Sequence, residues 1–224
     1  NTVSYNGSDY FITPDDWVNE TYNNSLRQEY SISASASNEK SNFYSSVNYL
    51  SNDGITVGSN YKRFTGRMKT DYQLKSWLKV GANMSYGHYN RNYLGDDGQS
   101  GSSGNAFSFM NAAPIYPMYV RDAQGNIMVD NRGFLRYDYG KPGQDSNGSR
   151  NTIPNANPLA SYMLDKMKYS GDVVSGKWSA DIDIWNGIKA KVNIGVDVNN
   201  VRATEMVNPF YGQYSETSGV GGLI

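Results

Sequence analysis

Few residues in this chain have the types and spacing that catalysis needs. His88 is the only histidine, so a Ser/His/Asp triad or a histidine-based zinc site would have to use it. It lies two residues after Tyr86 in an alternating apolar and polar segment, which favours an interfacial residue. The 224 residues contain no cysteine, which excludes disulfides, thiolate nucleophiles and cysteine-ligated zinc.

Two carboxylates are spaced so that they could act as a pair. Asp181 and Asp183 share one face of an alternating segment, as glycosidase carboxylates might. Lys177, Lys189 and Lys191 fall on nearby polar faces, so the pattern favours charge pairing over catalysis.

The glycine-rich stretch at residues 95–104 offers no convincing site for a metal or a phosphate. Asp96-Asp97-Gly98 lacks the alternating oxygen ligands of an EF-hand loop, and no Lys-Ser/Thr follows the glycines. We therefore expect no enzyme, no metal and no cofactor. The formal net charge of −1 likewise gives no support to nucleic-acid binding.

Strict alternation organises residues 61–89. Phe64 to Tyr72 and Leu78 to Tyr86 each place apolar residues at every second position, with a short turn between them. Period-2 alternation predicts β-strands with one apolar and one polar side, paired here as an antiparallel hairpin. Phe64 and Tyr72 would lie roughly 26 Å apart along a strand, or roughly 20 Å along the normal at a tilt of about 40°. That is close to the apolar band of about 25 Å in an outer-membrane barrel.

Further alternating segments extend this pattern along the chain. Strands are predicted over residues 29–37, 43–51, near 173–184 and 188–199. Short helices are predicted with Thr13 as N-cap and Pro14 at N1, and with Asn157 as N-cap and Pro158 at N1. The expected organisation is a lead-in at 1–28, four strands at 29–89, a long loop at 90–157, a helical turn with two strands at 158–199, and a loop at 200–224.

Connection lengths alternate between short and long. Turns near 38–42, 73–76 and 185–187 are short, whereas those near 52–60, 90–157 and after 200 are longer. An all-β, antiparallel, up-and-down sheet with short turns at one rim and long extracellular loops at the other is typical of a transmembrane β-barrel. No run of about 18 apolar residues predicts a membrane helix. Six strands cannot close such a barrel, because the smallest have about eight.

This fold assigns roles to the alternating residues. The aromatic side chains beside the short turns are expected to form a membrane girdle: Phe43, Tyr72, Trp77 and Trp185. The polar positions of the strands are expected to face the lumen: Arg63, Arg67, Lys79, Asn83, Lys177, Asp181, Asp183, Lys189, Lys191, Asn193 and Asp197. The apolar positions would then contact outer-membrane lipid.

Ordered motifs along most of the chain resemble a known family. They are Asp16-Trp-Val-Asn-Glu20, residues 35–44, Asn52-Asp-Gly-Ile55 with residues 58–63, residues 77–85, Ala113-Pro-Ile-Tyr-Pro117 with residues 121–126, Asn157-Pro-Leu-Ala160, Asp172-Val-Val-Ser-Gly176 and Asn208-Pro-Phe-Tyr-Gly212. With these motifs the chain resembles the SusC/RagA type of TonB-dependent outer-membrane transporter, in the first part of the barrel after the plug.

The resemblance implies a barrel of about 22 strands with a plugged lumen. It also implies an outer-membrane location in a Gram-negative bacterium, a SusD-like surface lipoprotein as lid, and import of a glycan or peptide energised through the TonB complex. The sequence shows no TonB-contacting segment, plug or barrel C-terminus, so we expect no transport from these residues alone.

The aromatic residues of the long loop allow two interpretations. They could pack locally within the loop, or they could contact the oligosaccharide or peptide substrate and the lid lipoprotein. These residues are Phe107, Phe109, Tyr116, Tyr119, Tyr137 and Tyr139. For the whole chain, the alternative class is a soluble, secreted carbohydrate-binding β-sandwich with Tyr and Trp on a sheet face.

Overall fold

The computed structural model describes most of the chain, with gaps mainly in the long loops and at the C-terminal end. The described residues are 2–5, 7–11, 15–92, 115–130, 133–140, 146, 148–149 and 157–206. Among them, no helix has the length and apolarity to cross a membrane.

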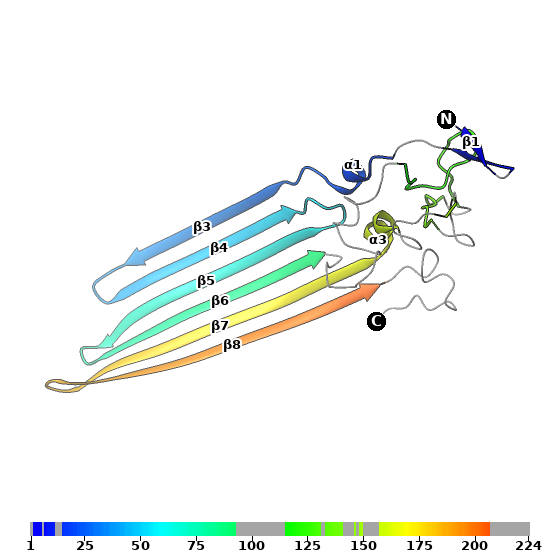
Figure 1. Cartoon of the computed structure of the whole chain (residues 1–224). Coiled ribbons are helices and arrows are strands. Elements are labelled where there is room, and N and C mark those ends of the chain that lie inside the picture. The colour runs from blue at the N-terminus through cyan, green and yellow to red at the C-terminus, as the bar shows by residue number, and fades with distance from the viewer. Residues whose placement is uncertain are drawn as a thin grey trace.

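Six long strands form one antiparallel sheet, in the same order as in the sequence (Figure 1). Their bounds are β3 Arg27–Ser37, β4 Ser41–Asp53, β5 Asn60–Lys75, β6 Leu78–Asn92, β7 Lys166–Trp185 and β8 Ile188–Met206. A separate two-stranded hairpin pairs β1 Thr2–Tyr5 with β2 Ser8–Phe11. The expected up-and-down, all-β architecture is confirmed, and the described strands show no second layer packed on the large sheet.

The short turns lie at one end of the sheet, where the sequence predicted them (Figure 1). The Asn38 side chain accepts hydrogen bonds from the amides of Lys40 and Ser41, at 2.9 and 2.7 Å, which closes the first turn. Gly187 has a φ of 86°, so a residue without a Cβ is favoured in the last turn. Tight turns between consecutive strands fix the register of each hairpin.

Two short helices lie at the opposite end. Helix α1 spans Trp17–Thr21 and helix α3 spans Pro158–Leu164. The prediction for α3 is confirmed, because the Asn157 side chain accepts from the Ala160 amide at 3.0 Å and Pro158 occupies the first turn. The predicted start of α1 was wrong. Asp16, not Thr13, caps this helix, and its carboxylate accepts from the Asn19 amide at 3.0 Å. Thr13 and Pro14 lie outside the described residues.

Two strands are longer than the sequence predicted. β7 begins at Lys166 instead of near Val173, and β8 continues to Met206 instead of ending near residue 199. At about 3.3 Å per residue, these strands are roughly 60 Å long and extend well beyond a hydrocarbon core of about 30 Å. The sheet therefore has a portion outside any membrane it would cross, on the side of the long connections.

Candidate functional site

One face of the large sheet is apolar along much of its length. The cross-strand register aligns apolar and small residues from all six strands, as in the row Ile32, Val47, Gly66, Tyr86, Val174 and Val198. Ile194 is 59% exposed and Val196 47% exposed, while Val80 and Ala82 are half-buried. None of these side chains is sealed in a core, so this face, here called the outer face, needs an apolar partner.

The apolar band on the outer face shifts from strand to strand. The upper limit of the band is its end nearer the long connections, and on β3 this limit is Tyr30. Tyr30 aligns through the sheet with Asn200 on β8, but the apolar residues of β8 begin two positions nearer the short turns, at Val198. Ala36, its lower limit on β3, aligns with Ile194, and on β8 the band continues to Ile188.

Both limits thus move toward the short turns, which also step along the strands in Figure 1. Over roughly 24 Å across the strands, the lower limit moves roughly 20 Å along them and the upper limit roughly 7 Å, which correspond to tilts of about 40° and about 15°. A level bilayer requires such a displacement when it crosses a sheet of tilted strands.

The polarity of the two faces reverses at the end with the long connections. Above the level of Asp172, the outward positions become polar, whereas the inward positions carry aromatic and apolar side chains. The outward set is Asn60, Lys62, Asn90, Asn92, Lys166, Lys168, Ser170, Arg202 and Thr204. The inward aromatic and apolar residues are Tyr61, Tyr89, Met167, Tyr169, Val201 and Ala203, and the inward positions also include the charged residues Arg63, Arg91 and Glu205. This reversal explains why the limits of β7 and β8 were predicted wrongly, since the pattern that identified them stops while the strands continue.

Aromatic side chains mark both limits of the apolar band. Near the short turns, Phe43 and Tyr72 are exposed on the outer face, and Trp77 and Trp185 lie exposed at the turns themselves. At the other limit, the aligned row of Tyr30, Tyr49 and Phe64 lies on the outer face. Tyr89 belongs to the opposite face, where its ring lies 6.2 Å from that of Tyr61.

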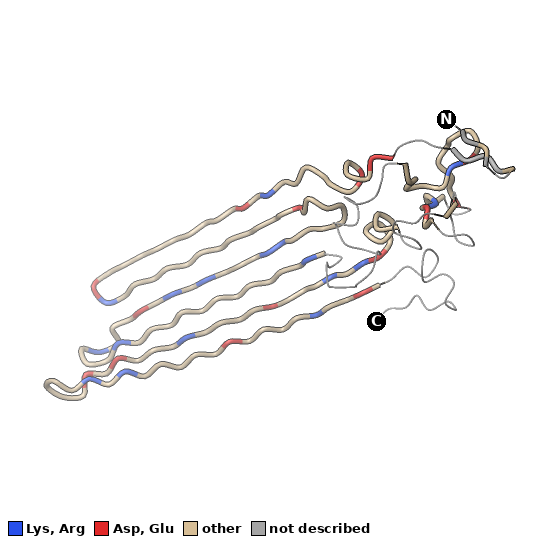
Figure 2. The backbone as a smooth tube through the Cα atoms, viewed as in Figure 1, with Lys and Arg blue, Asp and Glu red and all other residues tan. Residues whose placement is uncertain are grey.

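The predicted lumen residues all fall on the inner face of the sheet. The register places Arg63, Arg67, Lys79, Asn83, Lys177, Asp181, Asp183, Lys189, Lys191, Asn193 and Asp197 there, opposite the apolar band. Lys191 Nζ lies 3.3 Å from Asp181 Oδ1 and Lys189 Nζ lies 3.2 Å from Asp183 Oδ1. The two aspartates are therefore paired with lysines, as the sequence predicted. In Figure 2, several basic and acidic positions lie close together at the short turns, and others are spread along the strands.

His88 lies on the outer face, at the edge of the apolar band. Its Nδ1 is 2.8 Å from Asp172 Oδ1, and the same oxygen accepts a 2.7 Å hydrogen bond from the Tyr86 hydroxyl. Asn90 Nδ2 lies 3.0 Å from His88 Nε2. No serine or metal-binding cluster joins this network within the described part of the chain. The position agrees with the interfacial interpretation.

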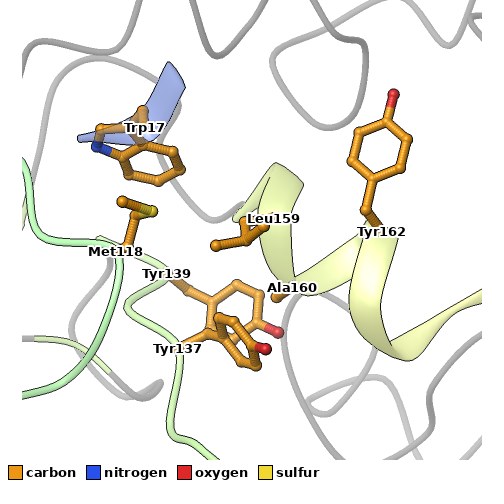
Figure 3. Packing of buried hydrophobic residues seen from close by; sticks show 7 residues of the cluster. All are labelled: Trp17, Met118, Tyr137, Tyr139, Leu159, Ala160 and Tyr162. Atoms are coloured by element: carbon orange, nitrogen blue, oxygen red, sulfur yellow. The ribbon is translucent and has the colours of Figure 1, made fainter. Parts of the chain in front are cut away.

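A compact hydrophobic cluster (Figure 3) involves α1 and α3, which lie at the end of the sheet with the long connections (Figure 1). Its buried members come from α1, from the loop segment 115–140 and from α3: Trp17, Met118, Tyr137, Tyr139, Leu159, Ala160 and Tyr162. We call this group the loop cluster. The cluster joins α1 to segments that follow it by about 100 or more residues. The entropy lost in closing so long a loop must be offset by substantial packing.

Polar contacts fix the same segments to one another. The Asp15 carboxylate accepts from the Met118 amide at 2.7 Å and from Arg121 Nη2 at 2.7 Å, and both charged side chains are largely buried. Trp17 Nε1 donates to the Tyr116 carbonyl at 2.9 Å. Hydrogen bonds to charged groups contribute about 1.5–3 kcal/mol each, so Asp15 anchors the long loop strongly.

Asn157 is the polar centre of the loop cluster. Its Nδ2 donates to the carbonyls of Met118 and Asp138, both at 2.8 Å, while its Oδ1 caps α3. The residue is almost fully buried, so this one side chain supplies hydrogen bonds that water cannot replace. The sequence motif predicted the cap but not the two contacts with the long loop.

The loop aromatics differ from one another in environment. Tyr137 and Tyr139 are buried in the loop cluster, where they pack with residues of α1 and α3, and their rings are not available for surface contacts. Tyr116 and Tyr119 are half-buried, and burial raises the pKa of Tyr119 to about 12. The Tyr119 ring lies 5.4 Å from that of Tyr137. Phe107 and Phe109 lie outside the described residues.

The chain is similar in sequence to proteins described as TonB-dependent receptors. Receptor P3 of Formosa agariphila is 23% identical over 188 residues, which cover 84% of this chain and 17% of the receptor. Receptor P39 of the same organism is 33% identical over 60 residues, which cover 27% of this chain and 6% of that receptor. No family model matches the chain.

Solved structures similar to this fold include the RagAB peptide importer. Its closed-closed state gives a TM-score of 0.66 at 23% identity, covering 90% of this chain and 21% of the matched chain. Its open-open state gives 0.65 at 22% identity, covering 89% and 20%. The chain thus spans about a fifth of the length of the proteins it matches.

The chain forms one open sheet of up-and-down antiparallel strands, whose fold is similar to part of the matched importer barrel. The resemblance to the SusC/RagA type of TonB-dependent transporter is confirmed by both the receptors and the importer structures. These relatives are receptors and importers rather than enzymes.

Proposed function

We propose that residues 1–224 form the first part of the barrel, after the plug, in a TonB-dependent nutrient importer of the outer membrane of a Gram-negative bacterium. The importer takes up glycans or peptides and works with a SusD-like surface lipoprotein. The observation that carries the proposal is the exposed apolar band that shifts from strand to strand, because a level bilayer that crosses tilted strands requires a shift in this direction.

The inner face is proposed to surround the plug and the transport path. Its alternating lysines and aspartates, such as Lys191 with Asp181, suit a water-filled or plugged interior and not a lipid contact. The complete barrel is proposed to have about 22 strands, in which further strands pair with the free edges of β3 and β8. The TonB complex would act through parts outside these residues.

The loop cluster is proposed to shape the extracellular vestibule. It fixes the long loop to α1 and α3, so Tyr116 and Tyr119 are held at a defined place where substrate or the lid lipoprotein could contact them. Direct contact with substrate or the lid lipoprotein is proposed for these two half-buried rings, and also for Phe107 and Phe109.

Cysteine labelling in the full-length protein tests the membrane orientation. Single cysteines at Val196 and Val80 should resist a water-soluble maleimide in intact cells and, when fluorescently labelled, should be quenched by brominated lipid. Their neighbours on the other face, Asp197 and Lys79, are the matched controls, and should not be quenched by that lipid. Because this segment has no native cysteine, only the remainder of the protein needs a cysteine-free background.

Rapid maleimide labelling at Val196 and Val80 without lipid quenching would instead support the soluble carbohydrate-binding class. Import is tested separately by growth. Deleting the gene should abolish growth on a particular oligosaccharide or peptide source, and the intact gene should restore it. Growth equal to the parent strain on every such source would exclude the proposed import.

A further inference from the structure

The outward face above the apolar band carries a group of cations. Lys62 on β5, Lys168 on β7 and Arg202 on β8 all occupy outward positions and are exposed, and Lys166 lies one outward position beyond Lys168. We call the first three residues the basic belt. None of them has an ion pair among the described residues.

The acidic residues of this region do not cancel the belt. Asp172 is the outward carboxylate on β7, and it already accepts hydrogen bonds from Tyr86 and contacts His88. Asp53 on β4 is aligned with Asn60 and lies diagonally from Lys62 without forming a salt bridge. The outward positions of this region therefore carry four cations and two carboxylates. One of the carboxylates, Asp172, is already bonded to side chains of the protein.

The belt lies where a lipid headgroup would be. Lys62 is two residues above Phe64, so it stands roughly 6 Å further along the strand than the aromatic limit of the apolar band. Arg202 is aligned with Lys62 through Asn90 and Ser170. Because the apolar band on β8 begins two residues lower, at Val198, Arg202 lies roughly 7 Å further beyond the band than Lys62 does. The belt thus spans a layer of about 10 Å directly outside the hydrocarbon.

The other rim of the outer face differs. Between Phe43 and the short turns, the outward positions on β6 to β8 are Leu78, Val80, Ala180, Ile182, Ile188, Ala190 and Val192, with no cation among them; on β5 they are Tyr72 and, beyond a bulge, Lys75. Apart from Lys75, the charges near the short turns are on the inner face or in the turns. Outward cations are thus concentrated at one rim, although the whole chain has a net charge of −1.

We propose that the basic belt binds the phosphate groups of anionic lipids in the leaflet on the side of the long connections. Exposed Lys and Arg side chains next to an apolar band are attracted by phosphate headgroups, and Arg can contact a phosphate through two hydrogen bonds. The reversal of face polarity supplies this surface, because it turns charged side chains outward where the strands leave the hydrocarbon. The inference rests on the proposed membrane orientation.

Lipid retention by the full-length protein tests the belt. The protein is reconstituted in nanodiscs of phosphatidylcholine with bisphosphorylated lipid A, and the lipid A kept after detergent washing is counted by native mass spectrometry. The variant Lys62→Gln/Lys168→Gln/Arg202→Gln should retain about tenfold less lipid A than the wild type. The control variant Lys40→Gln/Lys69→Gln/Lys79→Gln removes the same charge from a turn and from the inner face, and should retain the wild-type amount.

Further arms identify the bound group. Lipid A without its phosphates should be retained equally weakly by all three proteins, and inorganic phosphate added to lipid-A-free discs should not stabilise the protein against heat. Equal losses in the belt and control variants would overturn the proposal, as would a belt variant that keeps its lipid A but loses a protein partner.

Failure of the proposed membrane function gives a different result. In that case the wild-type protein does not insert into the discs, or the cysteine at Val196 is not quenched by lipid. Normal insertion of both variants with unchanged lipid A retention would overturn only the belt.

Discussion

At the scale of single residues, glycines shape the inner face near the long connections. The Tyr89 ring lies directly over Gly171 on the neighbouring strand, so a Cβ at Gly171 would meet Tyr89 Cζ at 2.5 Å. The same ring approaches Tyr61, and Arg91 lies 5.0 Å over the ring of Tyr169 in the adjoining row. Gly171 is therefore the place where a methyl group would disturb a set of stacked side chains.

We expect Gly171→Ala to destabilise the full-length barrel by about 1–3 kcal/mol, because the Tyr89 ring must leave its position. Gly195→Ala is the control on the same face. Its Cβ would have only an ordinary contact, at 3.9 Å from the Gly176 carbonyl oxygen, so little change is expected. Thermal unfolding in detergent measures both. Equal stability of the two variants would show that the Tyr89 position is not constrained by Gly171.

The residue scale also shows what alternation can predict. The pattern from Phe64 to Tyr72 and from Leu78 to Tyr86 assigned the correct faces, because a sheet with one face in an apolar medium imposes a period of two. For the same reason it predicted that Asp181 would pair with a nearby lysine, which the structure identifies as Lys191. The burial of Tyr137 could not be predicted, since its environment comes from Trp17 and Leu159, which are remote in the sequence.

At the scale of elements, strand limits were predictable only inside the apolar band. The start of β7 at Lys166 and the end of β8 at Met206 were missed, because outward Lys168 and Arg202 reverse the pattern there. The reversal itself is visible in the sequence as a shift of apolar residues from even to odd positions after Val198. Recognising it would have required knowing that the strands continue beyond the hydrocarbon.

The loop cluster depends on how α3 is connected to the long loop. Asn157→Asp keeps the oxygen that caps α3 but replaces two donated hydrogen bonds with an oxygen facing two carbonyls. We expect the variant to destabilise the cluster by about 2–4 kcal/mol, because two buried acceptors and a buried charge lose their partners. Asn24→Asp, at an exposed position, is the control and should have little effect.

Hydrogen exchange in the full-length protein measures this change. The Asp138 amide, which donates to the Met118 carbonyl at 2.8 Å, should lose protection in the Asn157 variant, while amides of β5 and β6 keep theirs. Unchanged protection at Asp138 would show that the loop is held without Asn157. A simultaneous loss in β5 and β6 would show that the cluster and the sheet unfold together.

At the scale of the whole molecule, the sheet has two free edges among the described strands, at β3 and β8. The part of β8 from Ile188 to Val198 carries the apolar band, so its unpaired backbone groups would lie in hydrocarbon. Each such group costs several kcal/mol in lipid, and edge strands leave about half of their amides unpaired. An isolated open sheet is therefore not a stable membrane structure, and the proposed remaining strands are needed to complete it.

Residues 1–224 expressed alone should therefore aggregate or require detergent, whereas β8 should be protected in the full-length protein. Exchange of the amides between Ile188 and Val198, compared with those of the central strand β6, measures this difference. In the full-length protein both strands should exchange equally slowly, because β8 gains a neighbour on its free side. In the detergent-solubilised segment, alternate amides of β8 should exchange much faster than those of β6. A monodisperse segment that unfolds cooperatively in water would contradict the membrane barrel, since its apolar band would then be compatible with solvent.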